Sequence, residues 1–276
     1  MVIGSRDIDK EYLRLEAVAH GKINPRTLVK RVRDLILIDL LGGINLVIAC
    51  DSNAAIGEKP MDSLKQPYAE MGRSAVKVPL MEVIAVGATP IVVVDALCVE
   101  MEPSGKKIIE AIRGELERAG LSASIEFTGS TEDNAETVQS GIGMTVIGLA
   151  TSTTLRLGRT QSGDAVVCVG IPKSGFHIPY REDDEDIAHV STVVKLNSLD
   201  YVHEILPIGS KGALYEAGEL AAYVGKRFQL FDEDLPIDLK ASAGASTAVL
   251  VSLNPGDIDR LRTELIEPVF IIGQII

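Results

Sequence analysis

The sequence predicts a mixed α/β (α+β) protein with two consecutive domains. Apolar runs rich in β-branched residues alternate with segments of helical periodicity, which indicates helices packed against sheets. The pattern weakens into Ser, Thr, Arg and Gly between residues 151 and 163, as is typical of a domain junction. A chain of 276 residues can form two ordinary domains, and we place them at residues 1–150 and 151–276.

The first half is expected to run helix, strand, helix, strand, helix, strand, strand. Asn24-Pro25 indicates the N-cap and first residue of the first helix, and Gly42-Gly43 its end. This order indicates a layered domain with helices against a sheet. The remaining elements are expected at residues 45–50, 76–86, 91–99, 106–119, 124–127 and 143–150.

The second half is also mixed and has no short-period repeat. A run of five acids, EDDED at residues 182–186, is interpreted as a solvated loop. Strands are expected at residues 165–170, 227–230, 247–253 and 268–275, and helices at 187–197, 213–224 and 255–265.

Composition excludes several classes of function. The formal net charge of −12 and the lack of a Lys/Arg block argue against a nucleic-acid partner, although a metal or local amides can still attract a nucleotide. No segment approaches the roughly 20 apolar residues of a membrane span, so we expect a cytoplasmic protein without a membrane partner. Cys50, Cys98 and Cys168 lie in β-like runs and are expected to be buried thiols.

Polar residues follow the first predicted strand. Asp51 and Ser52 open a loop that continues through Gly57, Lys59 and Asp62. α/β proteins commonly place ligands where a buried strand ends, and Mg²⁺ usually takes one or two carboxylates plus substrate phosphates. Asp51 is therefore a candidate magnesium ligand, and the alternative is a turn-forming residue.

Two acids interrupt otherwise apolar segments. Glu82 stands among apolar residues of a predicted helix, where a carboxylate is costly unless it is paired or metal-bound. The alternative is that it faces solvent or pairs with Lys77 or Arg73. Asp95 lies inside the strand IVVVDALC, where a ligand role and a structural role both stay open.

The loop at residues 128–134 (TGSTEDN) lies between two predicted strands. Such a loop can offer amides to phosphates and carboxylates to Mg²⁺, and a plain surface loop is the alternative. It contains a glycine, two hydroxyls, two carboxylates and an amide: Gly129, Ser130, Thr131, Glu132, Asp133 and Asn134.

The second half offers weaker candidates. Residues 170–179 form a Gly/Pro-rich turn with Lys173 and His177, and Lys211 precedes a predicted helix whose amides would face an anion. The sequence has no GxSxG, no GxxxxGK[ST] and no strand-associated GxGxxG. A serine hydrolase, a P-loop and a Rossmann nucleotide site are therefore not expected.

Together, these segments resemble the aminoimidazole-ribonucleotide-synthetase-like (PurM-like) ATP-binding superfamily, which includes thiamine-monophosphate kinase, selenophosphate synthetase and a hydrogenase-maturation protein. VPLMEVIAVGATP is similar to the family's N(L)SDxAAMGAxP, which places Glu82 at a metal-binding Asp. TGSTEDN is similar to its GGDT loop, and GDAVVCVGIPKSGFHIP to the opening of its second domain. ILPIGSKGALYEAGELAAYVG resembles its SDG-plus-helix segment, and PVFIIGQI its closing strand.

The resemblance implies an N-terminal α/β domain whose sheet forms a barrel with a second subunit, and a C-terminal α+β domain. ATP and Mg²⁺ would lie along the dimer-related cleft. The GGDT aspartate is Ser130 here, so Glu132 or Asp133 would supply the carboxylate, and the SDG aspartate is Lys211. A later GGDD segment resembles residues 244–247 (GAST), which lack both acids and suggest an acceptor other than thiamine phosphate.

A short branch that begins D-x-x-x-x-I-G-x-K-x-x-D, here residues 51–62, resembles α-ribazole kinase. We therefore expect a homodimeric, ATP- and Mg²⁺-dependent kinase that acts on α-ribazole. The alternatives are a thiamine-monophosphate-kinase-like enzyme or ATP-dependent synthetase of the superfamily, and a non-catalytic nucleotide-binding accessory protein.

The expected site residues fall into three groups. The metal ligands are Asp51, Asp62, Glu82, Glu132 and Asp133; the nucleotide-binding residues are Asp51, Ser52, Gly57, Lys59, Gly129, Ser130, Thr131 and Asn134; the catalytic residues are Lys59, Asp95, His177 and Lys211.

Overall fold

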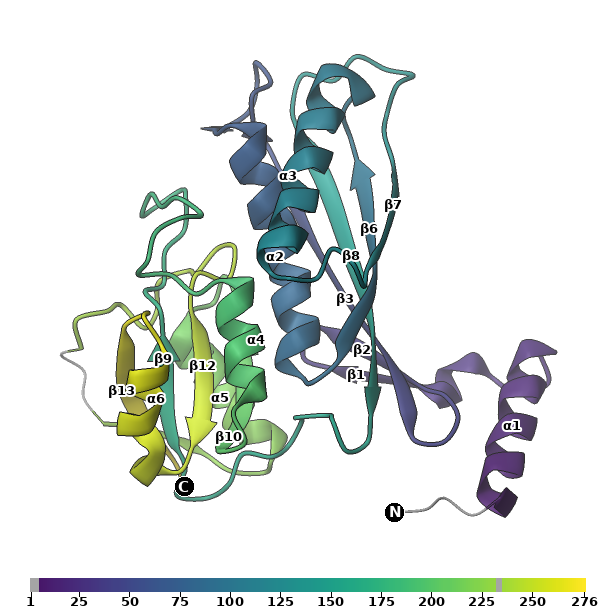
Figure 1. Cartoon of the computed structure of the whole chain (residues 1–276), viewed down its shortest axis with the longest axis vertical. Coiled ribbons are helices and arrows are strands. Elements are labelled where there is room, and N and C mark those ends of the chain that lie inside the picture. Colours follow the sequence, from purple (N-terminus) through teal and green to yellow (C-terminus); the bar gives the residue numbers. More distant parts are fainter. Residues whose placement is uncertain (1–4, 232–234) are drawn as a thin grey trace.

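The computed structural model describes residues 5–231 and 235–276, and it has two main β-sheets with helices on and between them (Figure 1). Strands from the first half of the chain form one sheet, and strands from the second half form the other. Helix α1 (Ser5–Ala19) extends to one side of this body (Figure 1). The architecture confirms the predicted mixed α/β class.

The first sheet has six strands in the order β1-β2-β3-β8-β6-β7. Neighbours are antiparallel except for the parallel pair β6–β7. A small parallel pair, β4 (Ile56–Gly57) and β5 (Leu64–Lys65), follows β3 in the sequence. The six strands are β1 (Val29–Val32), β2 (Leu35–Asp39), β3 (Ile44–Ala54), β6 (Thr89–Leu97), β7 (Glu126–Ser130) and β8 (Gly141–Thr151).

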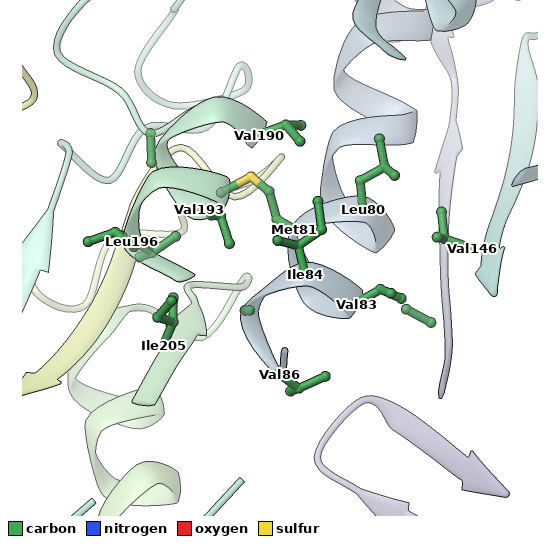
Figure 2. Close-up of a cluster of buried hydrophobic side chains, with 14 of the residues drawn as sticks. Leu80, Met81, Val83, Ile84, Val86, Val146, Val190, Val193, Leu196 and Ile205 are labelled. Carbon is green, nitrogen blue, oxygen red and sulfur yellow. The ribbon is translucent and has the colours of Figure 1, made fainter. Parts of the chain in front are cut away.

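Helices α2 (Tyr68–Ala85) and α3 (Lys106–Arg118) cover one face of this sheet (Figure 1). They pack closely, because a Cβ at Gly72 of α2 would lie 2.6 Å from the Ile108 carbonyl oxygen of α3. Most of α2 is buried, since it also contacts α4 (Val190–Ser198) on its other side. Figure 2 shows both contacts, with Leu80 facing β8 and Met81 facing α4.

The second sheet has five antiparallel strands in the order β10-β12-β9-β13-β11. Its central strands β9 and β12 are buried on both faces, because α4 and α6 (Ile258–Glu264) contribute to one core and α5 (Ala213–Tyr223) to the other. The strands are β9 (Ala165–Val169), β10 (Val202–Pro207), β11 (Phe228–Leu230), β12 (Val249–Leu253) and β13 (Val269–Ile275). Short turns are η1 (Pro25–Leu28), η2 (Met101–Gly105) and η3 (Pro255–Asp257).

The helix predicted after Asn24-Pro25 is wrong. Asn24 does cap a turn, since its side chain accepts a hydrogen bond from the Arg26 amide, but the turn ends at Leu28. The chain then forms the β1–β2 hairpin, whose connection includes Arg33 at a φ of 53°. The apolar residues of this segment fit the spacing of a helix and also that of a strand. Burial against the sheet favours strands.

Most other predicted elements are confirmed within a few residues. The sequence did not indicate α1, β1, β2 or β10, and β3 extends through Ala54. Asp51 therefore lies inside a strand and not in the loop after it. The domain division at residues 150 and 151 remains a prediction.

The face of the first sheet opposite α2 and α3 is apolar and partly exposed. The register places Ile36, Ile48 and Ile147 in one row across β2, β3 and β8. Leu46 and Leu149 belong to the next row on the same face. We call the residues Ile36, Ile38, Leu46, Ile48, Ile147 and Leu149 the outer apolar face.

The cysteine prediction is correct only for Cys168. Cys168 is buried in β9, and burial raises the pKa of its thiol to about 12. Cys50 and Cys98 are exposed. Cys50 shares the parity of Ile48 along β3, so it lies on the face that no helix of the first sheet covers.

The helices of residues 5–231 and 235–276 include none that is both long and apolar enough to span a membrane.

Candidate functional site

A cleft with a cavity of about 780 Å³ lies between the two halves of the chain. Strand β3 supplies Asp51 and Ser52, and the first turns of α2 supply Glu70 and Ser74. Residues 174–181 and 242–245 form the opposite walls. The volume is within the usual range for small-molecule sites.

The cleft combines charges of both signs with hydroxyl groups. Lys65 and Arg181 bring positive charge, while Asp51 and Glu70 bring negative charge. Ser52, Ser174 and Ser242 add hydroxyls. The walls approach closely, since a Cβ at Gly244 would lie 3.2 Å from the Ser174 Cα. These groups suit a polar ligand that carries an anionic part.

Asp51 belongs to a larger set of mutually repelling carboxylates. Burial and then the charge of Asp34 raise the pKa of Asp51, against a lowering contribution from the Ser52 amide. Burial, Asp34 and Glu216 raise the pKa of Glu82 to about 8. Burial and Asp34 also raise the pKa of Glu216 to about 7. We call Asp34, Asp51, Glu82 and Glu216 the acidic group.

Arg33 is the principal cation beside the acidic group, and it lowers the pKa values of both Glu82 and Glu216. Its Nη2 is held 2.7 Å from Glu204 in β10. Its Nε and Nη1 are buried and lack a hydrogen-bond partner among residues 5–231 and 235–276. Four carboxylates thus outnumber the cations beside them, which leaves an excess of negative charge next to the cleft.

Sequence reasoning missed two members of the acidic group, Asp34 and Glu216. Asp34 lies in the turn of the β1–β2 hairpin, in a segment expected to be helical. If the apolar and polar residues from Val29 to Asp39 are interpreted as two alternating strands, Asp34 falls in the turn between them. Glu216 lies in the first turn of α5, just after the candidate Lys211.

The predicted metal ligands do not gather around one point. No three His, Cys, Asp or Glu side chains of residues 5–231 and 235–276 are arranged to hold a metal ion. Asp133 accepts hydrogen bonds from the Met101 amide and the Thr131 hydroxyl, both at 2.9 Å. Glu132 accepts one from the Asn134 amide at 2.8 Å. These two acids thus stabilise their own loop.

The predicted loop residues Gly57, Lys59 and Asp62 also make internal contacts. Buried Asp62 accepts hydrogen bonds from the Lys59 amide at 2.8 Å and from the Ser140 amide and hydroxyl at 2.7 Å. A Cβ at Gly57 would lie 2.6 Å from the Ser140 hydroxyl oxygen, so this position requires glycine. Lys59 forms a 2.5 Å ion pair with Glu100. Their roles in metal or nucleotide binding stay predictions.

A second cavity of about 450 Å³ contains Asp95, Gly129, Ser130 and Thr131. Asp95 is buried, and its Oδ1 lies only 1.3 Å from where a Cβ of Gly129 would be. Its Oδ2 has no hydrogen-bond partner in the described part of the chain. Burial raises its pKa to about 6, although the Ser130 amide and Arg113 oppose the shift.

Asp51 and Asp95 occupy one row of the first sheet, because both pair with Met144 of β8. They open into different cavities, however. Among the predicted site residues, all of which lie in the described ranges, only Asp51 and Ser52 line the larger cleft.

The side chains of His177 and Lys211 do not line the larger cleft. His177 is exposed within the 174–181 segment, where its amide donates to the Ser174 carbonyl at 2.9 Å. Lys211 is exposed and donates to the Tyr215 hydroxyl at 3.1 Å. Tyr215, and to a smaller degree Glu216, raises the Lys211 pKa. The positive charge of Lys211 thus interacts with the negative charge of the acidic group.

Comparison with known proteins places the first half of the chain. Residues 33–150 match the family model described as AIR synthase related protein, N-terminal domain. Residues 33–150 are thus similar to an AIR synthase-related N-terminal domain. The matched residues include Asp34, Asp51, Glu82 and Asp95. No curated protein matches the chain in sequence.

Solved structures resemble the whole chain, residues 33–150 included. Thiamine-monophosphate kinase from Stenotrophomonas maltophilia K279a is 15% identical with a TM-score of 0.61, over 97% of this chain and 92% of that one. AaThiL complexed with AMPPCP and TMP is 14% identical with a TM-score of 0.60, over 100% and 93%. Hydrogenase maturation protein HypE in complex with ATP is 17% identical with a TM-score of 0.59, over 96% and 86%. The chain thus has a PurM-like fold.

Proposed function

We propose that this protein is an ATP- and Mg²⁺-dependent phosphotransferase that acts on a small-molecule acceptor in the cleft between its two halves. The observation that carries the proposal is the composition of the cleft, in which Asp51 of the acidic group faces a cavity that also contains Lys65 and Arg181. Structures of the same fold support a nucleotide ligand, since one is a complex with AMPPCP and TMP and another a complex with ATP.

The acidic group fits a divalent cation bound with a nucleotide. Asp51 and Glu82 have raised pKa values, in part because neighbouring carboxylates repel their negative charge. A cation would relieve that repulsion. Magnesium commonly uses one or two protein carboxylates and completes its shell with phosphate oxygens and water. Asp51, with Glu82 behind it, would hold the metal without a third carboxylate.

The cationic residues of the cleft would act on the phosphate groups. Phosphoryl transfer depends mainly on positioning and on neutralising charge on the transferred group. Lys65 and Arg181 line the cavity and would supply that charge. We assign them this role in place of Lys59, whose charge is paired with that of Glu100. Lys65 Nζ donates to the uncharged Lys59 and Pro60 carbonyls and so keeps its net charge.

The favoured acceptor is α-ribazole, on the basis of the sequence resemblance. Phe176 lines the cleft and its side chain is 56% exposed, so its ring is accessible for stacking on a planar heteroaromatic base. The Ser174 and Ser242 hydroxyls would hydrogen-bond ribose hydroxyls. A nucleoside offers both kinds of contact.

We also propose that the protein forms a homodimer through the outer apolar face. The rows Ile36–Ile48–Ile147 and Ile38–Leu46–Leu149 give this face a continuous strip of aliphatic side chains. Contiguous apolar surface on a soluble domain commonly marks an interaction site. A second copy of the same sheet would cover it.

The test is a kinase assay with purified protein, ATP and Mg²⁺ over a panel that includes α-ribazole and thiamine phosphate. We expect ADP to form only with an acceptor, and the phosphate to be recovered on that acceptor. Release of free phosphate only when a second nucleophile is present would indicate a synthetase. ATP binding without turnover for every acceptor would indicate an accessory protein and contradict the kinase proposal.

Asp51→Asn should reduce kcat/KM by about 100-fold or more, because it removes a carboxylate from the proposed metal position. Isothermal titration should also show weaker Mg²⁺–ATP binding. Asp39→Asn is the matched control, since Asp39 is an exposed carboxylate at the end of β2 outside the cleft. Equal activity of Asp51→Asn and wild type would remove Asp51 from the mechanism.

A further inference from the structure

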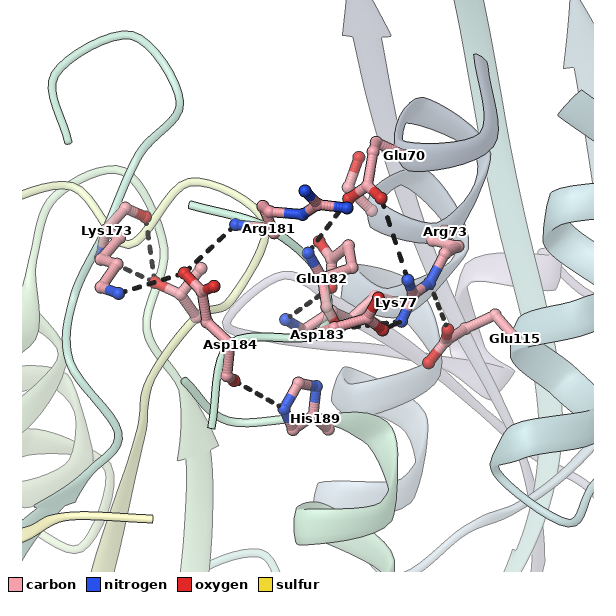
Figure 3. Close-up of polar contacts among 12 residues, drawn as sticks. Glu70, Arg73, Lys77, Glu115, Lys173, Arg181, Glu182, Asp183, Asp184 and His189 are labelled. Carbon is pink, nitrogen blue, oxygen red and sulfur yellow. Dashed lines mark hydrogen bonds and ion pairs between the residues drawn. The ribbon is translucent and has the colours of Figure 1, made fainter. Parts of the chain in front are cut away.

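The acidic segment at residues 182–186 is a loop, as its composition predicts, but it is not solvated throughout, because its first residue is buried. Its first residue, Glu182, is 1% exposed and pairs with Lys77, whose side chain is fully buried. Lys77 Nζ lies 3.2 Å from Glu182 Oε2 (Figure 3). The two residues are 105 positions apart, so this buried pair joins α2 to the second half of the chain.

Helix α2 also holds the backbone of Glu182 on both sides. The Glu182 amide donates to Glu70 Oε2 at 3.0 Å. The Glu182 carbonyl accepts from Arg73 Nη2 at 2.8 Å. Glu70, Arg73 and Lys77 are spaced i, i+3 and i+7, so they lie along one face of α2. Three residues along about two turns of one helix therefore fix the amide, the carbonyl and the carboxylate of a single residue.

We call Glu70, Arg73, Lys77 and Glu182 the α2 clamp. Its position next to the cleft gives it a role beyond joining two elements. Residues 179, 180 and 181 line the cavity and immediately precede Glu182. Glu70 lines the same cavity from α2. The clamp thus fixes the distance between two walls of the cleft.

The clamp also reaches the side chain of Tyr180. Burial, followed by the charge of Glu182, raises the pKa of the Tyr180 hydroxyl. Tyr180 is half-buried and lines the cavity. The carboxylate that pairs with Lys77 therefore also sets the surroundings of a cleft side chain.

Stability alone does not account for a fully buried ion pair. Desolvation of the two charges largely cancels their attraction, and a well-packed apolar pair of similar volume is commonly as stable. A buried pair does impose one geometry, because each charged group has a single well-placed partner. Here that geometry determines the position of the wall at residues 174–181.

We propose that Glu182, held by the α2 clamp, is a positioning residue that sets the shape of the acceptor side of the cleft. It does not touch the reacting groups and acts through Tyr180 and Arg181. The kinetic part of this inference rests on the proposed phosphotransferase activity, whereas the structural part does not.

The test uses the double variant Lys77→Met/Glu182→Met, which replaces both charges with apolar groups of comparable length. We expect it to fold, and we expect amide hydrogen exchange at residues 174–182 to increase by at least tenfold. With the acceptor that wild type phosphorylates, we expect the acceptor KM of the double variant to exceed the wild-type value by about fivefold or more. Any decrease in kcat should be smaller than the rise in acceptor KM, because Arg181, which would neutralise charge on the phosphate groups, belongs to the same wall.

Lys195→Met/Glu264→Met is the matched control, because this pair is more exposed and joins α4 to α6 away from the cleft. Its exchange at residues 174–182 and its acceptor KM should equal those of wild type. If the double clamp variant does not fold, Lys77→Gln/Glu182→Gln removes both charges, keeps hydrogen-bonding groups of similar volume, and is measured in the same way.

Unchanged exchange at residues 174–182 in a folded clamp variant would overturn the inference, and so would a kcat loss without a change in acceptor KM. If wild type transfers no phosphate to any acceptor, the proposed function fails, and hydrogen exchange alone then decides whether the clamp positions the wall.

Discussion

Glu82 is the residue whose chemistry departs furthest from what its sequence position indicates. The sequence predicts a metal ligand at Glu82, with a solvent-facing acid or a partner of Lys77 or Arg73 as the alternatives. Those two cations bind Glu182 instead. Glu82 is left half-buried beside the acidic group, where burial and the neighbouring carboxylates raise its pKa to about 8. Burial and repulsion therefore both disfavour the charged form of Glu82.

The raised pKa of Glu82 predicts a pH-dependent stability. The unfolded chain ionises this carboxyl near pH 4.5, whereas the folded protein holds the proton up to about pH 8. The folded state therefore loses stability as pH rises between these values. Without added divalent cations, Glu82→Gln should match wild type near pH 4.5 and exceed it by roughly 2–4 kcal/mol at pH 8.

Urea unfolding at pH 4.5, 6 and 8 measures this difference. Glu117→Gln on α3, an exposed helical glutamate, is the control and should shift stability little at any of the three pH values. A Glu82→Gln variant that is less stable than wild type at pH 8 would contradict the assignment.

At the scale of elements, sequence patterns predicted most of the strands and helices because their apolar periodicity is regular. The β1–β2 hairpin was missed because a good capping signal at Asn24-Pro25 precedes residues that suit either state. Glu182 was missed because five consecutive acids indicate a solvated loop, and only tertiary contact with α2 buries the first of them. Local sequence carries no signal for a partner about 100 residues away.

The residues of the candidate site were likewise predicted only where local sequence indicates them. Asp51 and Ser52 were found from the sequence because they continue a buried apolar run. Lys65, Arg181 and Phe176 were not, because they reach the cleft from two other segments, β5 and residues 174–181. Asp95 and the 128–131 segment were also identified, and the structure brings them together in a separate cavity.

At the scale of the whole molecule, the outer apolar face predicts self-association. Ile147 lies at its centre on β8, in register with Ile48. Light scattering coupled to gel filtration should show a dimer at micromolar concentration for wild type. Ile147→Asp should shift the protein toward monomer, because a charge would face a desolvated interface.

Ile266→Asp is the control for that experiment. Ile266 is 82% exposed and lies between α6 and β13, away from the outer apolar face. It should leave the dimer intact. A wild-type protein that remains monomeric, or an Ile147→Asp variant that remains dimeric and folded, would count against this interface.

Because the three cysteines differ in exposure, the labelling rates of their thiols report on unfolding and on self-association of the protein. A colorimetric disulfide reagent should modify Cys50 and Cys98 in the native state, and Cys168 only after β9 is exposed by unfolding. Titration should therefore count two fast thiols in buffer and three in denaturant. Three fast thiols in buffer would contradict the buried position of Cys168. Because Cys50 lies on the same face as Ile48, its labelling rate should also fall as protein concentration rises. One reagent would then measure two quantities. The labelling of Cys168 would give the rate at which the second sheet opens, and the labelling of Cys50 would follow the association of two copies through the first sheet.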